Sequence, residues 1–220
     1  MSTREYHLRE LEIARSPNDP RHVMPAILPK HRRILDVGCG AGQTLLASDL
    51  APGVRAVGID IDQEALELGA ELSDRVRFVA GSAEALPFAG GAFDLVIARV
   101  ALPLTYIPTA VAEMGRVLAP GGDVWLVLHS LGRTVELLVN NARQLEPKRA
   151  VYRSYVLANG SLYHLTGRMA PFPSSGRYET FQTDRSIARE LRRAGFGEIQ
   201  TTQGYHYVVT ATKQLAYGTL

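Results

Sequence analysis

The 220-residue sequence predicts an α/β fold in which helices cover both faces of a doubly wound, mostly parallel sheet of seven strands. Short apolar runs alternate with segments of helical periodicity over the first 129 residues, which indicates strand–helix–strand units. The connections between them are short and rich in glycine. The last two apolar runs follow each other closely, which predicts an antiparallel hairpin at the end of the chain.

The composition is that of an ordinary globular protein, with 46% hydrophobic and 21% charged residues. We expect a single domain over residues 1–220, with an inserted cap. No apolar run reaches 18 residues, and the first residues lack the apolar segment of a signal peptide. We therefore expect a cytoplasmic protein with no membrane partner. The single cysteine, Cys39, excludes an internal disulfide and is expected to be a buried, inert thiol.

The formal net charge of +2 is unevenly distributed. Residues 1–129 hold 12 Lys and Arg against 16 Asp and Glu, whereas residues 130–220 hold 12 against 6. A basic C-terminal part can steer an anionic substrate or nucleic acid, but solvated helix faces are the simpler explanation. We favour the second explanation, so nucleic acid is not the expected partner.

The N-terminal region, residues 1–30, is predicted to hold two helices. The first covers residues 3–15 and ends before Ser16-Pro17. The second begins at Asn18 or Asp19, with Pro20 in its first turn, and ends at Pro29.

Residues 31–129 are predicted to form the ligand-binding half. Strands are expected at residues 33–37, 54–60, 76–80, 93–98 and 123–129, and helices at 44–47, 64–72 and 108–118. Asp36, Asp60, Ser82, Arg99 and His129 stand at the carboxyl ends of these strands. Ligands of open parallel sheets bind at that edge, so these residues are expected to converge on one crevice.

The alternation stops after His129. Residues 130–182 are predicted to form a cap insertion of two helices, at 134–145 and 150–158, and an aromatic, proline-rich loop at 163–181. Residues 183–220 resume the pattern with a helix that Thr183 caps and Gly195 ends, followed by strands at 197–202 and 205–213.

The loop after the first strand places glycines at positions 38, 40 and 42. Glycine can turn with a positive φ and lets a ligand lie against the main chain. A dinucleotide fingerprint needs its last small residue where this chain has Gln43, so the spacing disfavours a nicotinamide cofactor.

Motifs after this loop extend the pattern. They are Val57-Gly58-Ile59-Asp60, the stretch Gly81 to Phe88, Phe93-Asp94-Leu95-Val96, and Arg116 to Gly122. In order and spacing, residues 33–129 resemble the class I S-adenosylmethionine-dependent methyltransferases. The branch they resemble most is the small-molecule methyltransferases of ubiquinone and menaquinone biosynthesis. The resemblance implies a Rossmann-like fold, S-adenosylmethionine as methyl donor and S-adenosylhomocysteine as product.

The resemblance also implies roles for individual residues. Gly38 and Gly40 would cradle the methionine part and the ribose, and Asp60 would accept hydrogen bonds from both ribose hydroxyls. Ile61 would cover the adenine. Ser82 replaces the family's usual Asp, so the Ala83 N–H would carry more of the adenine recognition. The Arg99 carbonyl would approach the methionine ammonium. Asp36 would either face the ligand or cap the glycine loop.

Methyl transfer from a sulfonium is an in-line displacement that mainly requires alignment and exclusion of water. If the acceptor is a hydroxyl, His129 is the first candidate for a base, ahead of Tyr106 and His164, although a packing role for His129 is also open. The histidine that relatives carry after the fourth strand is missing, because Ala101 to Leu104 stand there. No cluster of Asp, Glu and His shows metal-ligand spacing, so no metal is expected.

The cap insertion is the expected binding site for a small organic acceptor, aromatic or acidic. Its aromatic residues would form a roof, or would only pack the insertion onto the sheet, and three arginines could meet an acidic group; these residues are Tyr152, Tyr155, Tyr163, Phe172, Tyr178, Phe181, Arg153, Arg168 and Arg177. The function predicted is methyl transfer to such an acceptor. The alternatives are an RNA methyltransferase and a cofactor-binding protein without turnover. The oligomeric state is not predicted.

Overall fold

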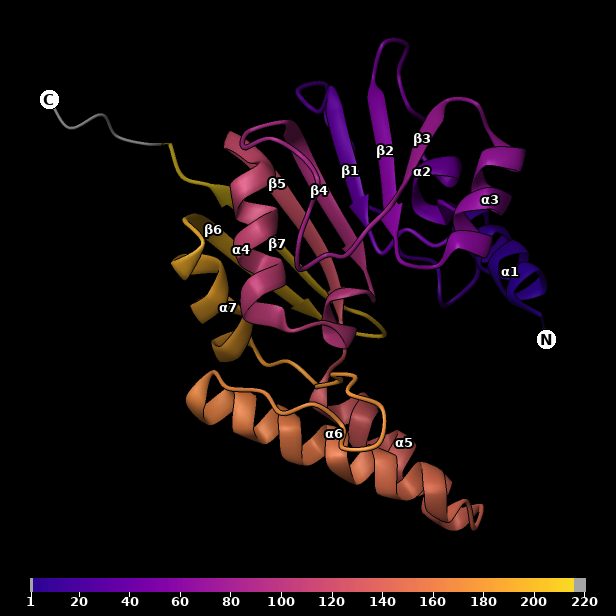
Figure 1. The fold of residues 1–220 in the computed structure, drawn as a ribbon, viewed down its shortest axis with the longest axis vertical. Coiled ribbons are helices and arrows are strands. Elements are labelled where there is room, and N and C mark those ends of the chain that lie inside the picture. The colour runs from indigo at the N-terminus through magenta and orange to yellow at the C-terminus, as the bar shows by residue number, and fades with distance from the viewer. Residues whose placement is uncertain (1, 216–220) are drawn as a thin grey trace, which may run out of the picture.

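The computed structural model describes residues 2–215, which form one seven-stranded sheet with helices on both faces (Figure 1). The strand order is β3-β2-β1-β4-β5-β7-β6. The strands β1 to β5 are mutually parallel, whereas β7 is antiparallel to both β5 and β6. The predicted fold class is confirmed.

The elements follow each other in nearly the predicted order. The strands are β1 (Arg33–Val37), β2 (Arg55–Asp60), β3 (Val76–Ala80), β4 (Phe93–Arg99), β5 (Leu118–Leu128), β6 (Phe196–Gln203) and β7 (Tyr207–Lys213). The helices are α1 (Thr3–Arg15), α2 (Gln43–Ala47), α3 (Gln63–Leu72), the 3₁₀ turn η1 (Leu102–Leu104), α4 (Ile107–Val117), α5 (Leu131–Arg143), α6 (Pro147–Thr166) and α7 (Asp184–Arg193).

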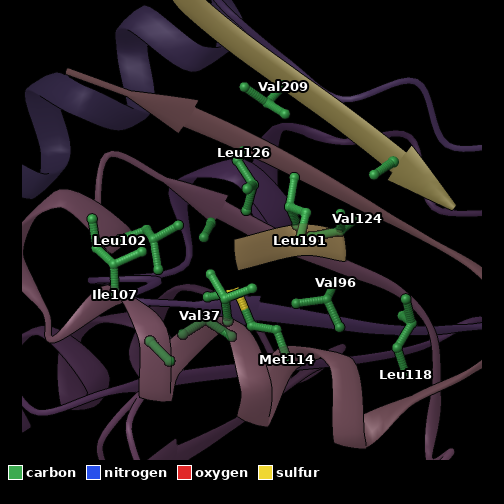
Figure 2. Close-up of a cluster of buried hydrophobic side chains, with 14 of the residues drawn as sticks. Val37, Val96, Leu102, Ile107, Met114, Leu118, Val124, Leu126, Leu191 and Val209 are labelled. Carbon is green, nitrogen blue, oxygen red and sulfur yellow. The ribbon is translucent and has the colours of Figure 1, made fainter. Parts of the chain in front are cut away.

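Two apolar cores hold the layers together, one on each face of the sheet. Alternate residues of a strand point to opposite faces, so Leu35 and Val37 enter one core while Ile34 enters the other. The larger core packs α4 and α7 against the sheet through residues such as Met114 and Leu191 (Figure 2). On the opposite face α2 packs on the sheet, and α1 contacts both α2 and α3.

The predicted second helix in residues 18–29 is wrong. Residues 17–21 form turns, and residues 22–28 have no regular structure. The Asp19 carboxylate accepts hydrogen bonds from the Arg21 backbone N–H, at 2.8 Å, and from its guanidinium. This local side-chain turn competes with a helix, and Pro25 has no N–H to continue one.

Helix α6 is longer than predicted, because it runs through the Asn159-Gly160 pair to Thr166. The pair looks like a break in the sequence, yet both residues are buried in the helix. A Cβ at Gly160 would lie 2.3 Å from Cδ1 of Phe181, and Asn159 bonds the backbone of Glu179 and Ala170. The pair therefore lets residues 170–181 lie close against the helix.

Strand β5 begins at Leu118, five residues before the predicted start at Asp123. The Pro120-Gly121-Gly122 segment, which lies between the predicted helix at 108–118 and the predicted strand at 123–129, is part of this strand. The register shift between Phe93 and Leu95 of β4 absorbs the irregularity.

The insertion after β5 forms a helical hairpin, α5 and α6, beyond the carboxyl ends of the strands (Figure 1). Backbone bonding joins it to the sheet where Gln182 N–H donates to the His129 carbonyl at 2.8 Å. The buried ring of Tyr163 belongs to the larger core. The hairpin is thus anchored at its base.

Candidate functional site

A cavity of about 390 Å³ lies at the carboxyl edge of the parallel strands. Its wall combines α1, the glycine loop after β1, the end of β2, the loop after β3 and the segment after β4. The structure brings together seven of the predicted cofactor residues in this wall: Gly38, Gly40, Asp60, Ile61, Ser82, Ala83 and Arg99. These residues come from four neighbouring strand ends, as the topology requires.

The glycine loop leaves no room for side chains. A Cβ at Gly38, where φ is +69°, would lie 2.2 Å from the Cβ of Ala101, and one at Gly40 would lie 2.7 Å from Cε1 of His7. Neighbouring segments thus close on both glycines, and the cavity meets bare backbone there.

The Asp60 carboxylate is held in place by the backbone. Its Oδ2 accepts from Gly40 N–H at 2.7 Å, and its Oδ1 accepts from Asp62 N–H at 3.0 Å. Each carboxylate oxygen keeps a lone pair for a further donor, so the group can still receive two hydroxyls. The next residue, Ile61, is 81% exposed and presents an apolar surface at the mouth of the cavity.

The loop after β3 gives the third part of the wall. The Ser82 hydroxyl accepts from Glu84 N–H at 3.1 Å and so fixes a short turn. This bond leaves the hydroxyl hydrogen of Ser82 free to donate. Ser82 and Ala83 both line the cavity.

Asp36 lies at the end of β1 but does not line the cavity wall. It is buried, and neither carboxylate oxygen has a hydrogen-bond partner among the described residues. Burial raises the pKa of Asp36 to about 7, an effect that Arg99 opposes. Cys39 is also buried, and burial raises the pKa of its thiol, so the thiol stays protonated.

Comparison with known proteins places these features in a family. Residues 34–122 match a family model described as a methyltransferase domain. The ubiquinone/menaquinone biosynthesis C-methyltransferase UbiE of Paracoccus denitrificans is 32% identical over 179 residues, which cover 77% of this chain and 68% of that protein. The chain belongs to the class I S-adenosylmethionine-dependent methyltransferases.

Other methyltransferases agree with this assignment. The uncharacterized methyltransferase YcgJ of Bacillus subtilis is 38% identical over 104 residues, 44% of this chain. That match takes in 40% of YcgJ, so the chain spans less than half of that relative. Human N-acetylserotonin methyltransferase, solved in complex with S-adenosylmethionine, has the same fold, with a TM-score of 0.63 and 18% identity over 97% of this chain and 56% of that one.

The site of this methyltransferase includes residues that the sequence did not indicate. Tyr6, His7 and Glu10 of α1 line the cavity opposite the glycine loop. The side-chain amide of Gln43 bonds Nδ1 of His7 and so ties α1 to the start of α2. The i, i+4 spacing of His7 and Leu11 predicts a buried helix face, but it does not say which surface that face covers.

His129 is not part of the cavity wall. It lies at the base of the insertion, where its Nδ1 is 3.8 Å from Oε1 of the buried Glu179. Glu179 also accepts from Arg153 at 2.6 Å and from the Tyr152 hydroxyl at 2.7 Å. Burial lowers the pKa of His129, although Glu179 opposes that effect, so the imidazole is neutral at pH 7.

None of residues 130–182, all of which are described, lines the cavity. Tyr163 and Phe181 of the insertion are buried, and Tyr152, Tyr155 and Phe172 pack against one another with ring centroids 4.9–5.8 Å apart. The ring of Tyr178 packs on that of Tyr106, at the start of α4, with the ring centroids 5.3 Å apart. These contacts favour packing over a roof for most of the aromatic residues.

The described residues hold no group of three or more His, Cys, Asp or Glu side chains placed to bind a metal ion. No helix in residues 2–215 is both long and apolar enough to span a membrane.

Proposed function

We propose that this protein transfers a methyl group from S-adenosylmethionine to a small organic acceptor by in-line displacement. The observation that carries the proposal is that the wall of one cavity joins the glycine loop, Asp60 and the loop after β3. When bound, S-adenosylmethionine supplies a methyl group that is already activated for displacement. The work left to the protein is binding, alignment and exclusion of water.

The residues present fit that cofactor. The bare glycine loop accepts a ligand against its backbone, and the Asp60 carboxylate can receive the two ribose hydroxyls. An adenine lying on the exposed side chain of Ile61 would bury its apolar surface. Asp36 is a buried carboxylate without a hydrogen-bond partner among the described residues, and the ammonium of a bound methionine group, which the Arg99 carbonyl would also accept from, would offset its desolvation.

The acceptor is proposed to enter beside Val100, Leu104 and Thr105, which line the cavity near the Gly38–Ala101 contact. Val100 and Leu104 are exposed, so an acceptor with an apolar or aromatic part gains contact there. The role of His129 as the base remains a prediction. Its neutral ring can accept a proton, but it would have to reach an acceptor held between the cavity and the insertion.

Calorimetric titration with S-adenosylhomocysteine tests the cofactor. We expect the native protein to bind it and Asp60→Ala to weaken that binding by about 10- to 100-fold, because the variant loses charge-assisted hydrogen bonds. Binding of nicotinamide dinucleotides in place of S-adenosylhomocysteine would refute the proposal. Unchanged affinity of Asp60→Ala would remove Asp60 from the ribose site.

The two alternatives make different predictions. An RNA methyltransferase would bind RNA in a salt-dependent manner, which a gel-shift series at rising ionic strength detects. One observation disfavours RNA as the substrate, because cations paired with carboxylates are less available to phosphate groups. Carboxylates pair with five of the twelve Lys and Arg side chains in residues 130–220: Arg133, Arg149, Arg153, Arg189 and Arg193. A protein without turnover would bind the cofactor and methylate no acceptor in a broad panel.

A further inference from the structure

The guanidinium of Arg99 is largely buried yet has few partners. Its side chain is 13% exposed, and its one hydrogen bond among the described residues goes to Oε2 of Glu10 on α1, at 3.4 Å. By contrast, the more exposed Arg116 makes four bonds of 2.6–2.8 Å through its guanidinium. A guanidinium has five N–H donors, so most of those of Arg99 remain available.

The sheet topology places Arg99 at one end of the cavity. The wall runs along neighbouring strand ends, from Ser82 and Ala83 after β3, through Ile61 after β2, to Arg99 at the end of β4. Three strand spacings of about 4.8 Å separate the two ends, roughly 14 Å in all. When the adenosine part of S-adenosylmethionine lies over Ile61, its methionine part is therefore placed near β4.

Two of the side chains around Arg99 are acidic. Glu10 contacts it, Asp36 lies near enough for Arg99 to lower its pKa, and Tyr6 and His206 also lie within its electrostatic range. Glu10 is a quarter exposed on a helix that forms one wall of the cavity, so it can withdraw from Arg99 without unfolding α1.

We propose that the Arg99 guanidinium binds the carboxylate of the cofactor's methionine, and that Glu10 holds this guanidinium until the cofactor arrives. The inference rests on the proposed function. A free carboxylate offers two oxygens to the planar guanidinium, whereas Glu10 offers one long bond. When the carboxylate of the cofactor replaces that of Glu10, the Arg99 guanidinium keeps an anionic partner. The exchange therefore leaves no buried charge unpaired.

The test compares two ligands that differ only in this carboxylate, by calorimetry. They are S-adenosylhomocysteine and its decarboxylated form, 5′-deoxy-5′-(3-aminopropylthio)adenosine. We expect Arg99→Gln to weaken the binding of S-adenosylhomocysteine by about 10- to 100-fold, and the binding of the decarboxylated ligand by less than about twofold. Unchanged affinity for the decarboxylated ligand also shows that the variant is folded.

Two further variants sharpen the comparison. Glu10→Gln removes the competing carboxylate, so S-adenosylhomocysteine should bind at least as tightly as to the native protein. Arg4 lies on the same helix as Glu10 and forms an exposed ion pair with Glu71 of α3; Arg4→Gln breaks this pair and serves as the matched control, with no effect expected on either ligand.

The outcomes separate the inference from the proposed function. Equal losses for both ligands in Arg99→Gln, or no loss for either, would overturn the inference while the proposed function stands. Weaker binding of S-adenosylhomocysteine to Glu10→Gln would overturn the holding role of Glu10. A native protein that binds neither ligand would remove the proposed function and the inference together.

Discussion

Among single residues, Asp36 has the environment with the clearest measurable consequence. Its carboxyl ionises near pH 4 in the unfolded chain and near pH 7 when buried. Between these values the folded protein holds one more proton than the unfolded chain, so its free energy of unfolding falls as the pH rises. Ionisation of the buried Asp36 lowers the free energy of unfolding by on the order of 4 kcal/mol in full. This loss is absent below pH 4 and complete above pH 7.

Asp36→Asn should therefore flatten the pH dependence of stability between pH 4 and 8. Chemical denaturation at several pH values measures it, with the exposed Asp49→Asn as control. The stability of the variant relative to the native protein should rise with pH and then level off above pH 7. A parallel pH dependence in the two proteins would show that Asp36 is ionised with a partner at neutral pH.

The sequence predicts residues well where local spacing fixes their position. Gly38, Gly40 and Asp60 converge because each stands next to the end of a parallel strand, and parallel strands end at a common edge. Glu10 and Tyr6 could not be found that way, because they reach the cavity only through the packing of α1 on α2 and α3. His129 also stands at a strand end, yet Glu179 and Gln182 hold it against the insertion.

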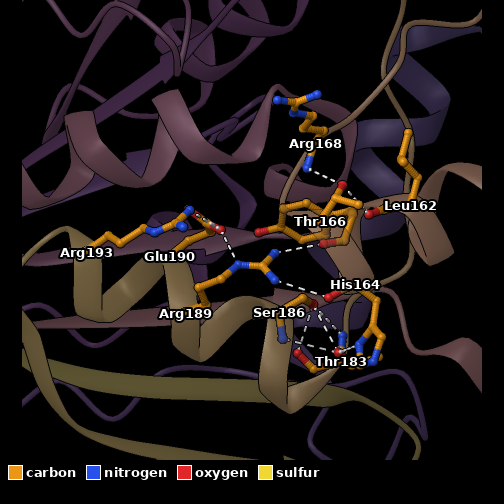
Figure 3. A network of polar contacts seen from close by, with 10 residues as sticks. Leu162, His164, Thr166, Arg168, Thr183, Ser186, Arg189, Glu190 and Arg193 are labelled. Carbon is orange, nitrogen blue, oxygen red and sulfur yellow. Dashed lines mark hydrogen bonds and ion pairs between the residues drawn. The ribbon is translucent and has the colours of Figure 1, made fainter.

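At the scale of elements, α6 is joined to α7 by a polar network centred on Arg189 (Figure 3). Its guanidinium donates to the Tyr163 carbonyl at 2.7 Å and the His164 carbonyl at 3.1 Å, near the end of α6. Its Nε donates to the buried Glu190 at 2.8 Å. These carbonyls belong to the last turn of the helix, where the Tyr163 carbonyl also accepts from the Gly167 N–H at 2.9 Å, so Arg189 adds donors to the end of α6 from a neighbouring element.

Arg189→Met keeps the side-chain stem and removes these donors. We expect it to destabilise the protein by about 2–3 kcal/mol, because Glu190 and the end of α6 lose charge-assisted bonds. Urea unfolding measures the change, and the exposed Arg192→Met in the same helix is the control, expected within about 0.5 kcal/mol of the native protein. A loss equal to that of the control would show that Arg189 does not anchor α6.

Sequence patterns predicted the strands more closely than the helices. The ranges of β1 and β3 are as expected, because buried parallel strands are short apolar runs with clear ends. The end of α6 was misplaced because Asn159-Gly160 is common in turns, and only the approach of Phe181 explains a glycine in mid-helix. The turn at Asp19 likewise replaced a helix through one side-chain bond that spacing does not reveal.

At the scale of the whole molecule, the cavity and the insertion are separate, since α5 and α6 contribute no residue to the cavity wall. Ligand binding stabilises the parts of a structure that must be folded to bind it, by about 2.7 kcal/mol at a ligand concentration of 100 times the Kd. Amides of α1 and of the glycine loop should therefore exchange more slowly with S-adenosylhomocysteine present. Amides of α5 and of the first half of α6 should keep their rates, because they can open without releasing the ligand.

Hydrogen exchange measured by mass spectrometry, with and without S-adenosylhomocysteine, follows both regions in one experiment. Protection confined to α1, the glycine loop and the strand ends would agree with a cofactor site complete without the insertion. Equal slowing in α5 would show that the hairpin closes over the bound ligand and would contradict the separation. Because the base of the hairpin carries His129 and Glu179, such closure would also bring the predicted base toward the acceptor.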